Sequence, residues 1–339
     1  MPEQDTAWWI YQGTGKKHND IKKKLPPPPP WRQFTKQAND ERGANFEPSL
    51  VEIELVNAAF YLRRPLLITG KPGIGKTTLA YAIAYELELG KVLRWSITTS
   101  SKLKDGLYSY DAIGRLQDAS LLESQGRNSR WFWNNTHKKE TDISRYLRLG
   151  PLGTALAAKN KPRVLLIDEI DKSDIDLPND LLHIFEEGEF PIPELARLHK
   201  KKYAIPNEDD EKVLIERGQV RCDTFPLVIL TSNGERDFSP AFLRRCLQLE
   251  MQLPDEEKLS RIVEAHLKLD PTQKEKINEL IKEFINRRDQ EKGDLATDQL
   301  LNAVYMVMKD VDPRRRDLDE FGKKLLDRLW KSLSTSSYS

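Results

Sequence analysis

Apolar residues change their spacing along the chain near residue 253. Between residues 46 and 253, short apolar runs alternate with stretches whose apolar residues recur at helical spacing. The short runs predict buried strands, and the recurring spacing predicts helices. We expect strands at 65–69, 91–98, 163–167 and 226–231, and helices at 48–63 and 76–88. Strands that alternate with helices predict a parallel α/β sheet with both faces covered.

Beyond residue 253 the strand pattern stops, and only helical patterning remains. It marks four segments, at 255–268, 272–287, 296–309 and 318–333. We therefore expect an α/β domain at 46–253, followed by a small all-helical domain at 254–335.

The first 45 residues differ from the rest of the chain. They combine aromatic, basic and proline-rich segments: Trp8, Trp9, Tyr11, Lys16–Lys24, Pro26–Pro30 and Trp31. Five consecutive prolines favour polyproline II and exclude a central strand or helix interior. Residues 1–45 are predicted to be either a semi-rigid, partly disordered arm or a docking segment. In the second case the aromatic residues would pack on this chain, on a neighbouring subunit or on a partner.

Composition narrows the classes of function. The 339 residues include 54 Lys and Arg against 53 Asp and Glu, so no overall basic field requires a nucleic-acid partner. The two cysteines, Cys222 and Cys246, indicate neither a metal site nor a disulfide scaffold. No apolar run approaches the roughly 20 residues that span a bilayer, and the N-terminal residues do not form a secretory signal. We expect a cytoplasmic protein without a membrane partner.

The segment Gly70–Thr77 fits the pattern G-x-x-x-x-G-K-[ST] between a predicted strand and a predicted helix. Its glycines let backbone N–H groups converge on phosphate oxygens, and the start of the helix favours an anion. Lys76 would bridge the β- and γ-phosphates, and the hydroxyl of Thr77 would bind Mg²⁺. The predicted nucleotide-binding residues are Gly70, Lys71, Pro72, Gly73, Ile74, Gly75, Lys76, Thr77 and Thr78.

Polar residues follow two further strands. Asp168 and Glu169 come after the strand at 163–167, at the sheet edge where parallel α/β proteins bind ligands. Asp168 would hold Mg²⁺ through a water molecule, and Glu169 would act as general base on the attacking water. Asn233 follows the strand at 226–231 in the segment TSN and would sense the γ-phosphate, or it would simply open an Asn-Gly turn.

These segments resemble the AAA+ ATPase superfamily, and within it the MoxR-like branch. The resemblance rests on four ordered motifs and covers roughly residues 46–335: RRPLLITGKPGIGKTTLA as Walker A, YLRLGPLGTAL before Walker B, VLLIDEIDK as Walker B and LVILTSN as sensor 1. It implies a three-layer α/β sandwich with a central parallel sheet, followed by a small helical lid. ATP and Mg²⁺ are the cofactors it implies, and ATP rather than GTP rests on the resemblance.

The segment SPAFLRRC resembles the arginine-finger segment of the family. Arg245 is the expected finger and Arg244 the second candidate, acting on the nucleotide of the next subunit. The alternative is an ordinary surface pair at a helix end. The late lid helix is expected to begin with a sensor arginine, but GDLATDQLLNAV at 293–304 has none. Because the nearest candidates, Arg287, Arg288 and Arg314–Arg316, fit that position poorly, we expect slow or partner-dependent hydrolysis.

Two insertions, at 99–150 and about 191–222, interrupt the motifs. The first carries Tyr108, Tyr110, Trp131 and Trp133. The resemblance implies that Tyr108 or Tyr110 grips a polypeptide in the channel of a ring. Ordinary packing of these aromatic residues is the alternative.

The resemblance implies a chaperone-like ATPase that forms a homo-oligomer, expected to be a hexameric ring, and remodels or activates a protein client. Members of this branch often act with partners that carry a von Willebrand factor A domain. Two other functions stay open. One is an ATP-gated signalling or scaffold switch, of the kind found in bacterial conflict systems, in which the arm recruits an effector. The other is a motor on DNA, which the balanced charge disfavours.

Overall fold

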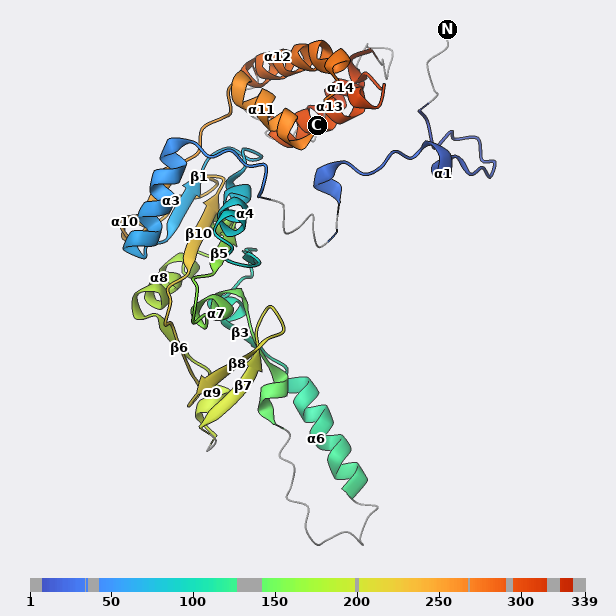
Figure 1. Ribbon diagram of the computed structural model, residues 1–339. Helices are drawn as coiled ribbons and strands as arrows, with labels where there is room; N and C mark the ends of the chain where they lie inside the picture. The colour runs from blue at the N-terminus through green and yellow to red at the C-terminus, as the bar shows by residue number, and fades with distance from the viewer. Residues whose placement is uncertain are drawn as a thin grey trace. The chain divides into compact units, whose positions relative to one another are not determined.

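A computed structural model describes residues 8–33, 35, 43–126, 142–198, 201–267, 269–290, 295–315 and 324–331. The chain divides into two compact units (Figure 1). The α/β unit comprises Pro48–Gly70 and Lys76–Met251. The helical unit comprises Met1–Glu47, Lys71–Gly75 and Gln252–Ser339.

A five-stranded sheet with the strand order β11-β1-β10-β5-β2 forms the centre of the α/β unit. Its strands are β1 (Leu66–Thr69), β2 (Leu93–Ser96), β5 (Val164–Asp168), β10 (Leu227–Ser232) and β11 (Leu247–Glu250). Every pairing in this sheet is parallel, which confirms the predicted fold class. β5 and β10 are buried along their whole length, as strands covered on both faces must be.

Helices cover this sheet and link its strands. α4 packs against β5 and β10, α3 against β1 and β11, and α7 against β2 and β5. α3 begins with a capping box in which Ser49 and Glu52 satisfy each other's backbone N–H groups. The helices with their bounds are α3 (Leu50–Leu62), α4 (Lys76–Glu86), α7 (Pro151–Leu156), η3 (Ile170–Lys172), α8 (Leu177–Glu187) and α10 (Pro240–Arg245).

The two predicted insertions form small sheets and short helices. β3 (Tyr108–Tyr110) pairs with β4 (Leu147–Leu149), beside α5 (Leu103–Leu107), α6 (Ala112–Gly126) and η2 (Ile143–Tyr146). A four-stranded antiparallel sheet has the order β6-β9-β8-β7. It comprises β6 (Glu189–Pro191), β7 (Lys202–Pro206), β8 (Lys212–Glu216) and β9 (Gln219–Arg221), with α9 (Pro193–Ala196) after β6.

The tyrosines of the first insertion are packed, which argues against their predicted role as polypeptide grips. Tyr108 is buried, and its hydroxyl donates to Glu194 Oε2 at 2.8 Å. Burial and this hydrogen bond raise the pKa of Tyr108. Tyr110 packs against the same core, and its hydroxyl accepts from Arg115 Nη1. Trp131 and Trp133 lie outside the described residues.

The helical unit confirms the predicted C-terminal helical region. Its helices are α11 (Glu256–His266), η4 (Pro271–Gln273), α12 (Lys274–Gln290), α13 (Thr297–Met308), η5 (Pro313–Arg315) and α14 (Leu325–Leu329). Phe284 and Trp330 pack edge to face in its core, with ring centroids 5.3 Å apart. No helix among the described residues is long and apolar enough to cross a membrane.

Of the arm aromatics named in the docking prediction, Trp31 packs on α13 within this unit, whereas Trp8, Trp9 and Tyr11 are exposed. Two short helical turns, α1 (Asp20–Lys24) and η1 (Pro30–Arg32), flank an extended proline segment. The Trp31 ring meets Tyr305 edge to face at 6.1 Å, and its Nε1 donates to Asn302 Oδ1 at 3.3 Å. The Tyr305 hydroxyl donates to the carbonyl of Pro27.

Candidate active site

The loop between β1 and α4 has the backbone conformation that its glycines were predicted to supply. Gly73 and Gly75 have φ angles of 75° and 100°, a region that favours glycine. Close packing reinforces this requirement at Gly73, because a Cβ there would lie 2.4 Å from Cβ of Ala296 at the start of α13. The loop is therefore a concave run of backbone whose N–H groups can converge on an anion.

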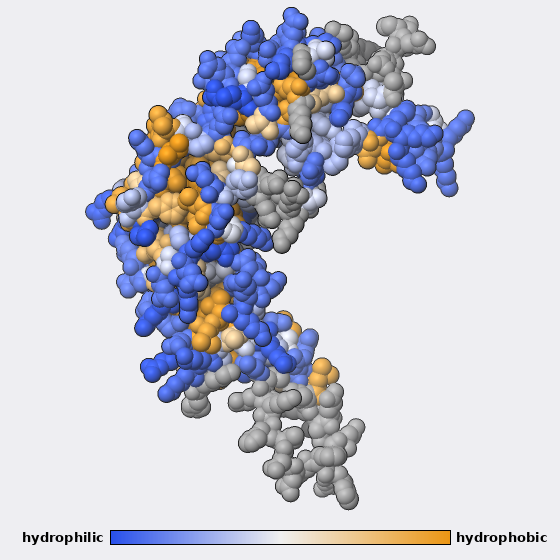
Figure 2. Space-filling model, viewed as in Figure 1, coloured by the Kyte–Doolittle hydropathy of each residue, from blue (hydrophilic) through white to orange (hydrophobic). Residues whose placement is uncertain are grey.

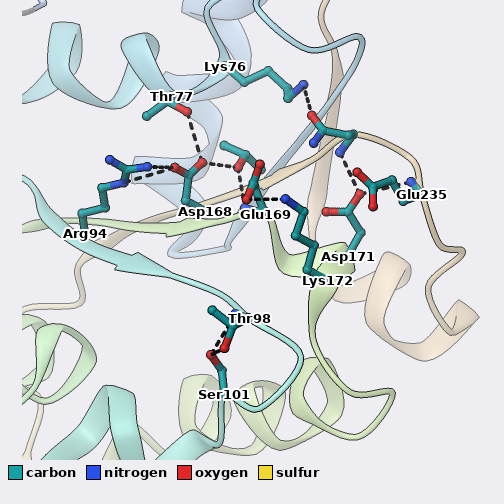
Figure 3. A network of polar contacts seen from close by, with 12 residues as sticks. Lys76, Thr77, Arg94, Thr98, Ser101, Asp168, Glu169, Asp171, Lys172 and Glu235 are labelled. Carbon is teal, nitrogen blue, oxygen red and sulfur yellow. Dashed lines mark hydrogen bonds and ion pairs between the residues drawn. The ribbon is translucent and has the colours of Figure 1, made fainter. Parts of the chain in front are cut away.

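Lys76 begins α4, and its side chain is buried (Figure 3). Its Nζ donates to the carbonyl of Gly70 at 2.6 Å and to Asn233 Oδ1 at 2.8 Å. Burial lowers the pKa of Lys76, and the charges of the nearby carboxylates partly offset that shift. Two residues predicted to face the γ-phosphate, Lys76 at the start of α4 and Asn233 after β10, are thus in direct contact.

Thr77 and Asp168, the two predicted Mg²⁺ residues, lie next to each other. The Thr77 hydroxyl donates to Asp168 Oδ1 at 3.1 Å. Hydroxyl and carboxylate oxygens are the ligands that Mg²⁺ prefers, so these residues fit that ion. Within the described residues no group of three or more His, Cys, Asp or Glu could hold a metal. Mg²⁺ would bind here together with nucleotide phosphates and water.

Thr231, near the end of β10, links the two acidic residues. Its buried hydroxyl donates to Asp168 Oδ1 at 2.6 Å and accepts from the backbone N–H of Glu169 at 2.9 Å. Glu169 has a φ of 61°, which is uncommon for a residue with a side chain and is typical of functional sites. The threonine fixes the backbone at the residue predicted to be the general base.

The Glu169 carboxylate forms an ion pair with Lys172. Its Oε2 accepts from Lys172 Nζ at 2.8 Å, one turn of η3 further along the chain. The hydrogen bond from Lys172 to Glu169 raises the pKa of Lys172. Both side chains are partly exposed, so water screens the pair and a short movement can separate it.

Asn233 both opens a turn and faces the site. Its backbone N–H donates to Asp171 Oδ2 at 2.9 Å, and that oxygen also accepts from the N–H of Glu235 at 3.1 Å. Gly234 follows with a φ of 78°. Because the buried Asp171 holds the backbone of this turn, the Asn233 amide is directed at Lys76. The two predictions for Asn233 are compatible in this structure.

Four residues in this network were not predicted from the sequence: Arg94, Asp171, Lys172 and Thr231. Asp171 and Thr231 lie within the Walker B and sensor segments, so their positions could have identified them as site residues. Arg94 interrupts the apolar run of β2 and donates to Asp168 Oδ2 from Nε at 3.1 Å and from Nη2 at 2.6 Å. Only the pairing of β2 with β5 brings this arginine to Asp168.

Arg244 and Arg245 lie at the end of α10, away from this network. Arg245 Nε pairs with Glu186, whereas Arg244 is exposed. The Arg64 guanidinium donates to the backbone carbonyls of both arginines. Their contacts within the described part of the chain do not include the predicted phosphate residues of the same subunit.

Three of the five alternative sensor arginines are bound inside the helical unit. Arg287 pairs with Asp327, and Arg288 donates to the carbonyl of Pro254. Arg314 pairs with Asp312 and Glu279. Arg316 lies outside the described residues. In place of an arginine, Ala296 at the start of α13 packs on Gly73 of the phosphate loop.

Comparisons with known proteins place these features in a family. A family model described as "AAA domain (dynein-related subfamily)" matches residues 65–246, which is more than half of the chain. A solved structure from Cytophaga hutchinsonii ATCC 33406, described as a "putative ATPase", is 14% identical with a TM-score of 0.36. The alignment covers 67% of this chain and 54% of that chain, so the match spans about half of that protein's length. No curated protein matches the sequence.

Proposed function

The chain belongs to the AAA domain family, dynein-related subfamily, and from this premise we propose that it is an ATPase that converts ATP to ADP and phosphate. One observation carries the proposal. Lys76, Thr77, Asp168 and Asn233 reach one sheet edge from three segments of the chain, where Lys76 contacts Asn233 and Thr77 contacts Asp168. The matched region contains every residue predicted for this site.

Each residue has a task that its contacts support. Lys76 Nζ would turn from the Gly70 carbonyl and Asn233 to the phosphate oxygens. Thr77 and Asp168 would hold Mg²⁺, which neutralises charge on the phosphates when bound. Glu169 would take a proton from the attacking water once its carboxylate separates from Lys172.

The direct test of the site is nucleotide binding by a Lys76→Ala variant. We expect loss of detectable binding of the fluorescent analogue MANT-ATP, because the loop loses its phosphate cation. Lys91→Ala is the matched control, since Lys91 is an exposed lysine of the same unit. Circular dichroism would show that both variants are folded. Unchanged affinity in folded Lys76→Ala protein would refute the assignment.

We further propose that the active site is shared between subunits of a ring, with Arg245 or Arg244 acting on the neighbouring nucleotide. Two surface features support this arrangement. Arg244 is exposed at the end of α10. α3 exposes apolar side chains that a neighbouring copy would cover, namely Leu50, Val51, Ile53 and Leu62. Figure 2 shows hydrophobic colour over this helix.

We propose remodelling of a protein client as the outcome of this cycle. The MoxR-like branch, a hexameric ring, a von Willebrand factor A partner and a cytoplasmic location remain predictions. The alternative of an ATP-gated switch draws support from Arg94 and Lys172, which pair with Asp168 and Glu169. These ion pairs would keep the site inactive until a ligand or a partner separates them.

A further inference from the structure

Asp168 is surrounded by donors from its own chain. Its Oδ1 accepts from Thr77 and Thr231, and its Oδ2 accepts twice from Arg94. The carboxylate is only 7% exposed, whereas the Arg94 side chain is 44% exposed. Because the Asp168 carboxylate is buried and held by two hydroxyls, its position is fixed. The more exposed Arg94 side chain can move away from it.

The sheet explains why Arg94 reaches this carboxylate. β2 pairs with β5 so that Ser96 lies opposite Asp168, and the side chains of β2 alternate between buried and exposed. Trp95 points into the core, where its ring fills the space beside Gly106. With Trp95 anchored on one face of the strand, Arg94 is directed along the other face toward Asp168.

Magnesium and the guanidinium would therefore compete. A hydrated Mg²⁺ that uses Asp168 would come close to Arg94, and two cations on one partly buried carboxylate repel each other. We propose that Arg94 is a positioning residue that sets the Mg²⁺ requirement of nucleotide binding, because its guanidinium must leave Asp168 before the ion can use this carboxylate. This inference rests on the proposed nucleotide site.

The test is a Mg²⁺ titration of MANT-ADP binding. ADP is not hydrolysed, so the measurement does not depend on turnover. Arg94→Met, which keeps the length of the side chain without its charge, should reach half-maximal binding at an about ten-fold lower Mg²⁺ concentration than wild type. Arg94→Lys should stay close to wild type. In EDTA, Arg94→Met should bind MANT-ADP no more tightly than wild type, because the benefit appears only with the metal.

Arg148→Met is the matched control. Arg148 is 42% exposed and also pairs with an aspartate, Asp210, but on the insertion strand β4. The Arg148→Met variant should reach half-maximal MANT-ADP binding at the same Mg²⁺ concentration as wild type. If Arg94 only stabilised the fold, Arg94→Met would lower the melting temperature and leave the Mg²⁺ midpoint unchanged. If Arg94 helped Asp168 to hold the ion, the midpoint would rise. Either result would overturn the inference.

A failure of the proposed function gives a different result. In that case wild-type protein would not bind MANT-ADP at any Mg²⁺ concentration. Binding by wild type with an unshifted or raised midpoint in Arg94→Met would overturn the inference alone.

Discussion

At the scale of single residues, Thr231 connects the two acidic residues of the site. One hydroxyl satisfies both the Asp168 carboxylate and the backbone N–H of Glu169, whose φ of 61° carries a cost. A buried group that loses its partner costs about 1–3 kcal/mol. The position therefore links local stability to the orientation of both acidic residues.

We predict that Thr231→Val, which keeps the shape but removes the hydroxyl, lowers unfolding stability by about 1–3 kcal/mol. It should also reduce ATP turnover more than nucleotide affinity, because the loop contacts remain. Urea unfolding and steady-state kinetics measure the two effects. Thr224→Val is the control, since the Thr224 hydroxyl donates to the Lys159 carbonyl, outside the site. If Thr231→Val and wild type had equal unfolding stability, the hydrogen bonds of Thr231 would contribute nothing to the stability of the fold.

At the scale of elements, α13 connects two regions that are distant in sequence. Trp31 and the Pro27 carbonyl contact Asn302 and Tyr305 of α13. The start of the same helix, at Ala296, packs on Gly73 of the phosphate loop. The arm and the phosphate loop thus both contact α13. We therefore expect that loss of the arm contact also changes the packing of α13 on the loop.

We predict that Trp31→Ala speeds amide hydrogen exchange in α13 and lowers the melting temperature, because it removes an aromatic pair worth about 0.5–1.5 kcal/mol beyond its buried area. Trp9→Ala is the control in the same arm, since Trp9 is more exposed. Hydrogen-exchange mass spectrometry of the full chain is the measurement. Identical exchange in α13 for both variants would show that Trp31 does not stabilise this helix.

The sequence predicted the elements whose burial is complete. The apolar runs of β5 and β10 mark central strands, because both faces of these strands are covered. β11 escaped prediction because its Leu-Gln-Leu-Glu pattern belongs to an edge strand with one open face. The short strands of the insertions alternate polar and apolar residues too briefly to be recognised. Motif spacing located Lys76, Thr77, Asp168 and Glu169, whereas the Arg94 contact depends on strand pairing that no local pattern encodes.

At the scale of the whole molecule, we propose that a neighbouring subunit completes the site. Arg244 and Arg245 lack contacts with the phosphate residues of their own subunit among the residues described, and one of them is exposed. An arginine that acts in trans would neutralise charge on the γ-phosphoryl group of a neighbour. Assembly would then control hydrolysis more than it controls nucleotide binding.

We predict that an Arg244→Ala, Arg245→Ala double variant loses about a hundred-fold or more of its ATPase activity while it still binds MANT-ATP. Lys76→Ala protein keeps the arginines but cannot bind nucleotide. Mixed oligomers of the two should recover part of the activity, because intact sites then face intact arginines. No recovery in mixtures that demonstrably co-assemble would contradict the shared site.

Phosphate release by Glu169→Gln protein, under conditions where it binds MgATP, decides whether this sheet edge is the ATPase site. Loss of a general base typically costs about 100- to 10,000-fold in rate. We expect wild-type protein to release phosphate from ATP, and Glu169→Gln to bind ATP with similar affinity while phosphate release falls by at least about a hundred-fold. Phosphate release at the wild-type rate in Glu169→Gln would contradict the assignment of this sheet edge as the ATPase site.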